Sequence, residues 1–200
     1  MRVISGTARG AKLFSLPGRD VRPVSDRVKT SLYNILGTEV EGAKVLDLFA
    51  GTGALGIEAL SRGAERCVFV DIGRDSVRVI RQNLEKTRLA EKAVVLLCDV
   101  YRIMPRLETL GEKFTLVIVA PPYPLVRDPI TRGDLERLVA KLADGEWLVP
   151  GALIVVQHVA GGVFETRSAA MKVVDEREYG ITKLTFIRKQ TEFLLATDRA

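Results

Sequence analysis

From residue 44 onward, short apolar runs alternate with segments whose apolar residues recur at helical spacing. Strands that are apolar throughout and separated by helices are typical of a parallel sheet covered on both faces. The pattern therefore predicts an α/β fold with five parallel strands. The strands are expected at residues 43–50, 66–72, 93–99, 114–120 and 152–158, and the helices at 54–63, 74–90, 100–111 and 131–150.

The C-terminal part departs from this alternation. Residues 172–190 contain two strand-like runs joined through Tyr179 and Gly180, which predicts a hairpin that closes one edge of the sheet. Together the elements predict a doubly wound, mostly parallel seven-stranded sheet with helices on both faces and an antiparallel C-terminal hairpin. This Rossmann-like domain is expected to span residues 44–200.

The first 43 residues are expected to form an arm and a helix that pack on this domain. Strand-like pieces occur at 2–6 and 12–16, and a helix is predicted at 25–36. Ser25 or Asp26 is placed to cap that helix, because short oxygen-bearing side chains accept hydrogen bonds from the first free N–H groups.

Charge along the chain is uneven. The first 30 residues hold seven basic side chains against two acidic ones, whereas the other 170 residues balance at 23 against 23. A basic arm beside a neutral domain favours a polyanion as partner, and nucleic acid is the commonest polyanion. Arg9, Lys12 and Arg22 are therefore expected to contact the phosphates of a nucleic acid. The alternative is a basic surface that is merely solvated.

Composition sets the general class of the protein. Hydrophobic residues make up 47% of the 200-residue chain, which is enough for one main core. No apolar run approaches the roughly 20 residues of a membrane span, so a cytoplasmic protein without a membrane partner, expected to be a monomer, is favoured. Cys67 and Cys98 are expected to be buried reduced thiols rather than a disulfide or metal site, and His158 to have a structural or surface role.

A glycine-rich loop follows the first strand of the domain. Gly51, Gly53 and Gly56 form a G-x-G-x-x-G pattern, and Asp71 comes twenty residues after Gly51 at the end of the second strand. This is the spacing of a dinucleotide fingerprint, so a nicotinamide-dependent enzyme has to be considered. Glycines allow close approach of the backbone to a ligand, and an acid at this place can bind ribose hydroxyls. Both features suit any cofactor that contains adenosine.

Two acidic residues favour S-adenosylmethionine over a dinucleotide. Asp47 lies four residues before the first glycine, where it could stiffen the loop or face a cationic amino group. A pyrophosphate would be repelled by an acid at that position. Asp99 ends the third strand and offers an acceptor to the adenine amino group. All of these residues follow strands, at the edge where open α/β sheets bind ligands.

The fourth strand ends in the stretch Ala120-Pro121-Pro122-Tyr123. The two prolines make a stiff corner that offers carbonyl acceptors, because proline has a fixed φ and no N–H. Tyr123 offers a flat face on which a base can stack, a contact of about 1–3 kcal/mol. Acceptors that hold the hydrogens of an exocyclic amine favour a nitrogen whose lone pair can attack a sulfonium methyl group. The corner therefore predicts methylation of a nucleobase amine.

These features resemble class I methyltransferases that act on exocyclic amines, through DLFAGTGALGIEALSRGA (47–64), the acid after the second strand and the proline corner. RVISGTARGAKL (2–13) and VRPVSDRVKTSLYNIL (21–36) resemble the bacterial RsmD family more specifically. The resemblance implies methylation of guanine N2 in 16S ribosomal RNA, in the 30S subunit or its assembly intermediate. It also implies that the arm grips this RNA and that residues 22–29 pack over the methionine end of the cofactor.

Two groups of site residues are expected within that resemblance. The catalytic corner would consist of Ala120, Pro121, Pro122 and Tyr123, with no metal. The cofactor site would consist of Arg27, Asp47, Phe49, Ala50, Gly51, Gly53, Asp71, Ile72, Asp99 and Val100.

Ala120 departs from the family pattern, which has Asp or Asn at this position before the two prolines and an aromatic residue. Loss of one preorganised polar group commonly lowers a rate by about 10²–10³. A second hypothesis is therefore an RNA-binding or ribosome-assembly protein with a residual cofactor site and weak or lost catalysis. A nicotinamide oxidoreductase remains a third hypothesis, although no catalytic His, Tyr-Lys pair or second domain is evident.

Overall fold

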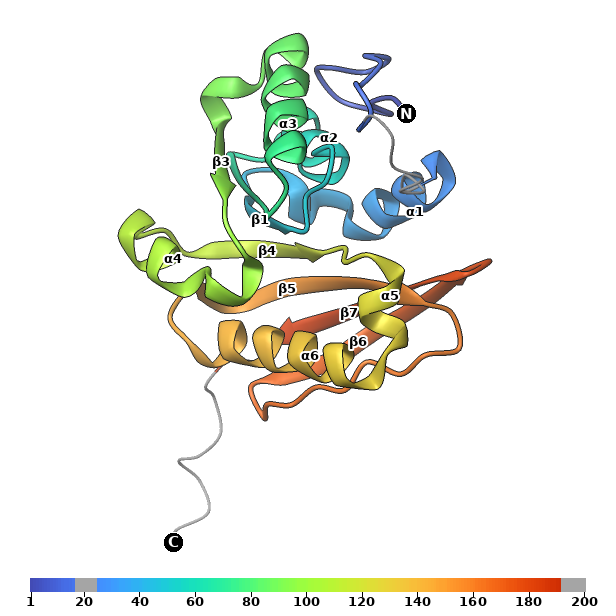
Figure 1. The fold of residues 1–200 in the computed structure, drawn as a ribbon, viewed down its shortest axis with the longest axis vertical. Helices are drawn as coiled ribbons and strands as arrows, with labels where there is room; N and C mark the ends of the chain where they lie inside the picture. Colours follow the sequence, from blue (N-terminus) through green and yellow to red (C-terminus); the bar gives the residue numbers. More distant parts are fainter. Residues whose placement is uncertain (17–24, 192–200) are drawn as a thin grey trace, which may run out of the picture.

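A seven-stranded sheet forms the centre of the computed structural model, which describes residues 1–16 and 25–191 (Figure 1). The strand order is β3-β2-β1-β4-β5-β7-β6. The first five strands are parallel, and β7 runs antiparallel to both β5 and β6. The predicted fold class is confirmed. The strands are β1 (Lys44–Leu48), β2 (Arg66–Asp71), β3 (Ala93–Leu97), β4 (Phe114–Val119), β5 (Leu148–Val159), β6 (Met171–Tyr179) and β7 (Thr182–Lys189).

Helices cover both faces of the sheet. The first three pack on one face and the last three on the other, each over its own apolar cluster. None of the helices in residues 1–16 and 25–191 is long and apolar enough to cross a membrane. The helices are α1 (Asp26–Leu36), α2 (Ala54–Ser61), α3 (Arg74–Thr87), α4 (Met104–Leu110), α5 (Tyr123–Arg127) and α6 (Pro129–Asp144), with short 3-10 turns η1 (Gly37–Val40), η2 (Ala90–Lys92) and η3 (Val100–Arg102).

The two-sided cover explains why the strands are apolar throughout. In β4, Leu116 and Ile118 belong to the cluster beneath α1–α3, whereas Val117 and Val119 belong to the cluster beneath α4–α6. Successive side chains of a strand point to opposite faces, so a strand buried on both faces needs an apolar residue at every position. Polar groups are consequently left to the ends of the strands.

The position of β1 between β2 and β4 creates the switch point of this sheet. The chain leaves β1 toward β2 and β3 on one side, and later passes to β4 and β5 on the other. Ligands of open α/β sheets bind in the crevice beyond the carboxyl ends of the strands at such a point. The glycine loop after β1 and the proline corner after β4 therefore emerge next to each other.

Several boundaries differ from those predicted. The pieces at 2–6 and 12–16 form only an isolated bridge between Arg2 and Lys12. The predicted helix at 131–150 ends at Asp144, because Gly145 caps it, and β5 already begins at Leu148. The last predicted turn of that helix is therefore wrong.

Two further helical segments differ from the prediction. The predicted helix at 100–111 is divided into η3 and α4, which has a proline in its first turn. Helix α5, directly after the proline corner, was not predicted because its five residues are too short to show a helical period.

The isolated polar residues behave largely as expected. His158 is buried, and its Nε2 atom is hydrogen-bonded to Thr185 Oγ1 at 2.8 Å, which confirms a structural role. Burial lowers the pKa of His158. Cys67 and Cys98 are free thiols, but only Cys67 is fully buried. The prediction of two buried thiols is therefore right for one of them.

A buried carboxylate, Glu58 on α2, holds the N-terminal arm (residues 1–16). It accepts hydrogen bonds from the backbone N–H groups of Ile4 at 2.8 Å and Ser5 at 3.0 Å. Its other partners are Lys29 of α1, with 3.3 Å between charged atoms, and Arg62, with 2.8 Å. Lys29 is fully buried, so it belongs to this core contact and is not available to a polyanion. Of the seven basic side chains counted in the first 30 residues, Lys29 therefore does not add to an exposed basic surface.

The arm also needs a glycine for its approach to α2. Gly6 has φ of 83°, and a Cβ atom there would lie 1.7 Å from the carbonyl oxygen of Ser61. Thr7 donates its N–H to that same carbonyl oxygen at 2.8 Å, and Ser61 Oγ accepts from the N–H of Ala8 at 2.9 Å. The arm is thus bound to α2 through its backbone, which leaves the side chains of Arg9 and Lys12 exposed.

Replacement of Glu58 should expose how strongly this contact holds the arm. Glu58→Gln keeps the side-chain shape but leaves the buried ammonium group of Lys29 without its full counter-charge, so the free energy of unfolding should fall by about 3–5 kcal/mol. The double variant Glu58→Gln/Lys29→Met removes both charges and should recover part of the loss. Urea unfolding of the three proteins measures both effects. A double variant less stable than Glu58→Gln would contradict the role assigned to the ion pair.

Candidate active site

The loop after β1 takes a backbone shape that few residues can adopt. Gly51 has φ of 58° and Gly53 has φ of 78°, and Phe49 also has a positive φ of 60°. A non-glycine residue in this region is uncommon, and such conformations collect at functional sites. The N–H of Gly53 donates to the carbonyl oxygen of Ala50 at 2.7 Å, which closes the turn just before α2 begins.

The third glycine of the pattern has a different role. A Cβ atom at Gly56 would lie 2.3 Å from the ring of Phe69 and 2.7 Å from Cys67 Sγ. Gly56 therefore lets α2 lie directly on β2, as expected for the third glycine of this motif. Gly51 and Gly53 shape the loop, whereas Gly56 allows the helix to pack.

Asp47, at the base of the loop, is almost completely buried. Its Oδ2 atom accepts the N–H of Gly56 at 2.9 Å, while its Oδ1 atom is buried without a partner among the described residues. Burial raises the pKa of Asp47 from 3.8 to about 7, the N–H of Gly56 opposes this rise, and the charge of Asp71 adds to it. An unpaired buried oxygen is rare and fits a site that receives a charged donor.

Asp71 joins the loop to the start of α3. Its Oδ2 atom accepts the N–H of Gly51 and its Oδ1 atom that of Gly73, both at 2.8 Å. The sequence did not predict that Asp71 would hold the glycine loop in place, the role that is called the loop clamp below. Each carboxylate oxygen can accept a second hydrogen bond, so the predicted contact with ribose hydroxyls remains open to it.

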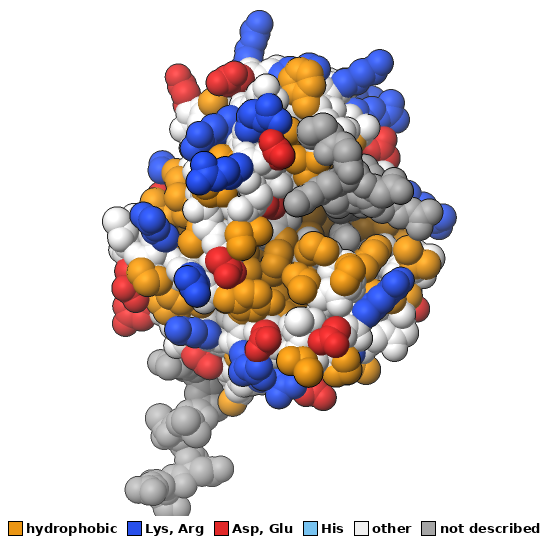
Figure 2. Space-filling view, viewed as in Figure 1, with side chains coloured by type: hydrophobic (Ala, Val, Ile, Leu, Met, Phe, Trp, Pro, Cys, Tyr) orange, Lys and Arg blue, Asp and Glu red, His pale blue; other side chains and the backbone are white. Residues whose placement is uncertain are grey.

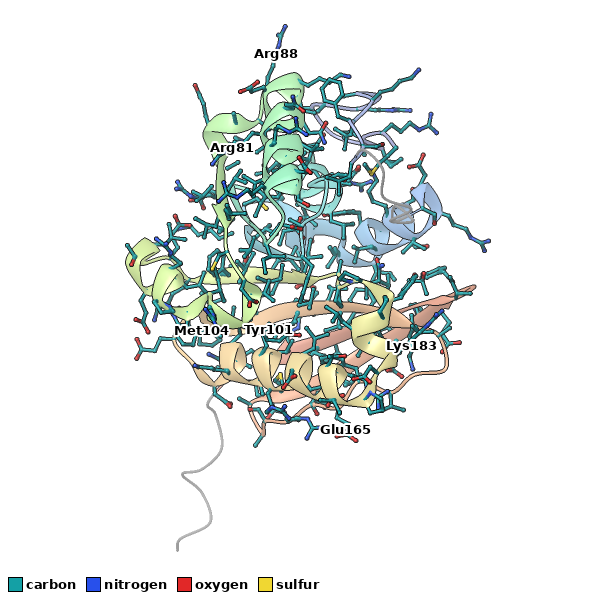
Figure 3. The ribbon with its side chains drawn as sticks, in the orientation of Figure 1. Arg81, Arg88, Tyr101, Met104, Glu165 and Lys183 are labelled. Atoms are coloured by element: carbon teal, nitrogen blue, oxygen red, sulfur yellow. The ribbon has the colours of Figure 1, made fainter. Side chains whose placement is uncertain are left out.

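The end of β3 contributes an acid and an exposed aromatic ring. Asp99 Oδ1 accepts the N–H of Tyr101 at 3.0 Å, and Val100 between them is buried. Tyr101 is 41% exposed and contacts Phe49 edge to face, with 6.5 Å between ring centres, while Ile72 is 71% exposed. Figure 3 places Tyr101 in the turn between β3 and α4.

An apolar area thus lies open at the carboxyl edge of the sheet. Figure 2 shows hydrophobic side chains gathered in the middle of this face. Exposed Ile72 and Tyr101 suit a planar ring, and Asp99 offers a polar contact at its rim. Tyr101 was missed from the sequence because it fell inside a predicted helix, although an aromatic residue two positions after a candidate acid was a usable signal.

The corner after β4 is tied to β1 at one end and to β7 at the other. The N–H of Ala120 donates to the carbonyl oxygen of Leu48 at 3.3 Å. Tyr123 begins α5, and its hydroxyl is hydrogen-bonded to Thr182 Oγ1 at 2.5 Å. Pro121 is buried and Pro122 is exposed. The C-terminal hairpin therefore fixes the ring of Tyr123 from outside the corner.

The side-chain acceptor missing at Ala120 is not replaced by Asp128. That carboxylate caps α6, where its Oδ1 atom accepts the N–H groups of Ile130 at 3.0 Å and Thr131 at 2.9 Å. These N–H groups, that of Thr131 first, lower the pKa of Asp128. Within the described residues, the carbonyl oxygens of Ala120 and Pro121 accept no hydrogen bond, so they face no competing donor.

One asparagine side chain is hydrogen-bonded to both the arm and the glycine loop. Asn83 of α3 is fully buried; it accepts the N–H of Phe14 at 2.7 Å and donates to the carbonyl oxygens of Phe14 at 3.2 Å and Thr52 at 2.9 Å. This residue was not singled out from the sequence, because nothing local marks an asparagine that binds segments 31 and 69 residues away.

The remaining predicted residues can be placed only in part. Arg9, Lys12 and Arg27 are exposed, while Arg22 lies outside the described residues. The predicted cover of residues 22–29 over the methionine end of the cofactor likewise falls partly outside them. The RNA contacts of these residues stay predictions.

The shifted pKa of Asp47 predicts an unusual dependence of stability on pH. The native pKa of about 7 lies above the ordinary 3.8, so between these pH values the native protein binds more protons than the unfolded chain. This group therefore lowers the free energy of unfolding as pH rises from 4 to 7, by about 4 kcal/mol at most. Asp47→Asn should remove that decline, measured by urea unfolding without cofactor.

Asp128→Asn is the matched control, because the native pKa of Asp128 is lowered. Asp128 contributes stability that is lost as pH falls, so the stability difference between this variant and the wild type should change with pH in the opposite direction. If the stability of Asp47→Asn followed that of the wild type in parallel from pH 4 to 7, the assignment of a raised pKa would be wrong.

Comparison with known proteins places the chain in a family. Residues 1–188 match the family described as "Conserved hypothetical protein 95". The chain is 32% identical over 190 residues to "Putative rRNA methyltransferase YlbH" of Bacillus subtilis. The aligned region covers 95% of this chain and all of that protein. It is 35% identical over 157 residues to "Ribosomal RNA small subunit methyltransferase D" of Escherichia coli, covering 78% and 74% of the two chains.

A solved structure agrees with this assignment. "Putative methyltransferase yhhF from Escherichia coli" superposes with a TM-score of 0.77 at 30% sequence identity, covering 95% of this chain and 98% of that chain. The match extends over the arm, the glycine loop, the proline corner and the hairpin alike. The chain belongs to this family, the RsmD family of ribosomal RNA methyltransferases.

Proposed function

We propose that this protein transfers a methyl group from S-adenosylmethionine to the exocyclic N2 amine of a guanine in 16S ribosomal RNA. The observation that carries the proposal is the buried Oδ1 atom of Asp47, which has no partner among the described residues and lies beneath a glycine loop, next to the corner that ends β4. A dinucleotide would bring a pyrophosphate to the loop, where this carboxylate would repel it. A cofactor with an ammonium group would instead satisfy it.

The described residues fit the parts of such a cofactor. Asp47 and the loop with Gly51 and Gly53 would hold the amino-acid end, with the exposed side chain of Arg27 beside it. Asp71 would accept hydrogen bonds from the ribose hydroxyls. Asp99 would bind the adenine amino group, while Ile72 and Tyr101 would pack against its ring. When bound, the cofactor supplies an electrophilic methyl group on a sulfonium.

The corner would orient the target amine. The ring of Tyr123 can stack on the base, and its bond to Thr182 fixes the plane of that stack. The carbonyl oxygens of Ala120 and Pro121 would accept hydrogens from the amine, so that the nitrogen lone pair points toward the methyl group. The cofactor would supply the methyl group to this nitrogen with its sulfur as the leaving group, and the amine would lose one proton to solvent. Orientation and fixed acceptors carry the catalysis.

The main alternative is an RNA-binding or ribosome-assembly protein whose chemistry is weak or lost. It is favoured by one observation: position 120 holds a methyl group, and Asp128 is committed to the start of α6. The proposed partner is the same in both cases, 16S ribosomal RNA in the 30S subunit or its assembly intermediate. We propose a cytoplasmic monomer.

Methyl transfer from labelled S-adenosylmethionine to 30S subunits and precursor particles that lack the mark tests the proposal directly. Nucleoside mapping should then locate the label on N2 of one guanine. Binding of the particles and of the cofactor without transfer would favour the alternative. Tighter binding of NAD than of S-adenosylmethionine, measured by calorimetry, would exclude the proposed cofactor site.

Ala120→Asp should raise the rate of methyl transfer. A carboxylate offers stronger acceptors than a methyl group to a nitrogen that gains positive charge, and this contact strengthens in the transition state. The single-turnover rate should therefore rise by about 10²–10³ with little change in RNA affinity. Ala120→Asn is the neutral control and should give a smaller gain. Equal or slower chemistry in a folded, cofactor-bound Ala120→Asp protein would contradict the missing-acceptor hypothesis.

Tyr123 should act at an earlier step than residue 120. Tyr123→Ala removes the stacking surface and should weaken RNA capture by about 1–3 kcal/mol, because stacking is available before the chemical step. Tyr123→Phe keeps the ring but loses the bond to Thr182, so it should retain most of the affinity and lose part of the single-turnover rate. If both variants bound RNA as the wild type does, the ring would have no role in capturing the base.

A further inference from the structure

Most arginines outside the N-terminal arm either pair with a carboxylate or lie in one segment of the chain. Within residues 25–191, eight arginines have a carboxylate oxygen within 4.0 Å, including those on α6 and the C-terminal hairpin. Segment 74–106 differs, with eight basic residues against four acidic ones. Five arginines of this segment form no ion pair and no side-chain hydrogen bond with any of the described residues. They are Arg74, Arg81, Arg88, Arg102 and Arg106, called here the β3-edge arginines.

Three of these arginines form a row along α3 and its C-terminal cap. Arg74 and Arg81 are seven residues apart in the helix, so they lie on nearly the same side of it, about 10 Å from each other. Arg88 follows directly after the helix, where it caps the C-terminal end with a positive φ of 59°. All three are exposed, while Ile80 and Leu84 bury the opposite side of α3. The row therefore stands clear of the core.

The other two arginines lie across the edge of the sheet. Arg102 belongs to η3 and Arg106 to α4, which packs on the face opposite to α3. Strand β3 is at the end of the sheet order, between these two helices. Figure 3 shows Arg81 projecting from α3 toward the side of β3 and Arg88 at the outer end of the helix, with Met104 marking the start of α4 below. In Figure 2, Lys and Arg side chains surround the apolar area from above and from the left.

We propose that the β3-edge arginines bind the phosphate backbone of 16S ribosomal RNA at a distance from the target base. This inference rests on the proposed function. Arginine presents a rigid fork of donors that matches phosphate, and none of these guanidinium groups is paired with a carboxylate of residues 1–16 or 25–191. A cluster of like charges repels itself unless a polyanion neutralises it.

The sheet order sets where this contact lies. Three strand spacings of about 4.8 Å separate β3 from β4, so the surface begins roughly 14 Å from the proline corner. The N-terminal arm packs on the other side of α3, where Asn83 and Lys86 meet Phe14. The RNA would therefore be held on two sides of α3 while the target base reaches the corner.

The test compares two double variants with the same change in net charge. Arg81→Gln/Arg106→Gln removes one arginine from each side of β3, and leaves Arg74 and Arg102, which are near the cofactor residues, intact. Arg137→Gln/Arg177→Gln removes two exposed arginines that are paired with Asp134 and Asp175. Affinity for 16S ribosomal RNA is measured over a range of salt concentrations. Both variants should keep the thermal stability and cofactor affinity of the wild type, because exposed substitutions rarely exceed about 0.5 kcal/mol.

The β3-edge variant should lose at least tenfold in RNA affinity at about 0.1 M salt, and the slope of log affinity against log salt should become shallower by about 1.4–1.8 for two lost contacts. Arg81→Lys/Arg106→Lys keeps the charge and should retain the slope. The paired-arginine variant should behave as the wild type does. Equal losses in the two glutamine variants, or no loss in the β3-edge variant, would overturn the inference.

The outcome separates this inference from the proposed function. A wild type that methylates the RNA, together with an unaffected β3-edge variant, rejects the second contact surface alone. A wild type that neither binds nor methylates the RNA rejects both.

Discussion

Glu58 accepts hydrogen bonds from the backbone of the arm while its charge is balanced by Lys29 and Arg62. An irregular segment can lie against a core only if its N–H groups find partners, and two of them do so here through one carboxylate. A similar contact holds the irregular segment that follows β5. Glu136 of α6 accepts the N–H of Glu165 at 3.0 Å and pairs with Arg167 at 2.7 Å. Two irregular segments, the arm and the segment after β5, are thus held by buried glutamates on helices.

The glycine loop is held from several directions before any ligand arrives. Asp47 binds the start of α2 and Asp71 binds the loop itself, while Asn83 links the loop to the arm. Fixed donors and acceptors need no rearrangement when charge develops nearby, which is the physical basis of electrostatic preorganisation. Because Asn83 touches both the arm and the loop, the RNA contacts proposed for the arm and the cofactor contacts proposed for the loop would share one buried residue.

The corner after β4 combines a retained framework with a missing functional group. Its prolines and the bond between Tyr123 and Thr182 preserve the position of a stacking surface. Ala120 offers only a backbone carbonyl where the family pattern has a side-chain acceptor. Backbone carbonyls are fixed acceptors, but they carry only a partial charge, so they stabilise a developing cation less than a carboxylate does. For the proposed reaction, this corner would therefore contribute more to holding the base than to accelerating the transfer.

The sequence alone was sufficient for features whose signal is local. The strands of the parallel sheet and the hairpin follow from periodicity and turn residues, and the glycine loop and proline corner are contiguous motifs. The fold class and the edge that carries the site could therefore be predicted. The short helix α5 and the start of β5 could not, because neighbouring elements decide segments of a few residues.

Only the tertiary structure decided which polar residues serve the core and which serve the site. In the sequence, Lys29 is one more basic residue among the first 30, yet it is buried against Glu58, 29 positions away. Asp71 is predicted from the sequence to bind ribose, whereas the structure shows it as the loop clamp. Thr182 and Asn83 carry no local signal at all. The free energy of a polar side chain depends on burial and on its partners, and both are set by segments that are distant in the chain and meet only in the folded protein.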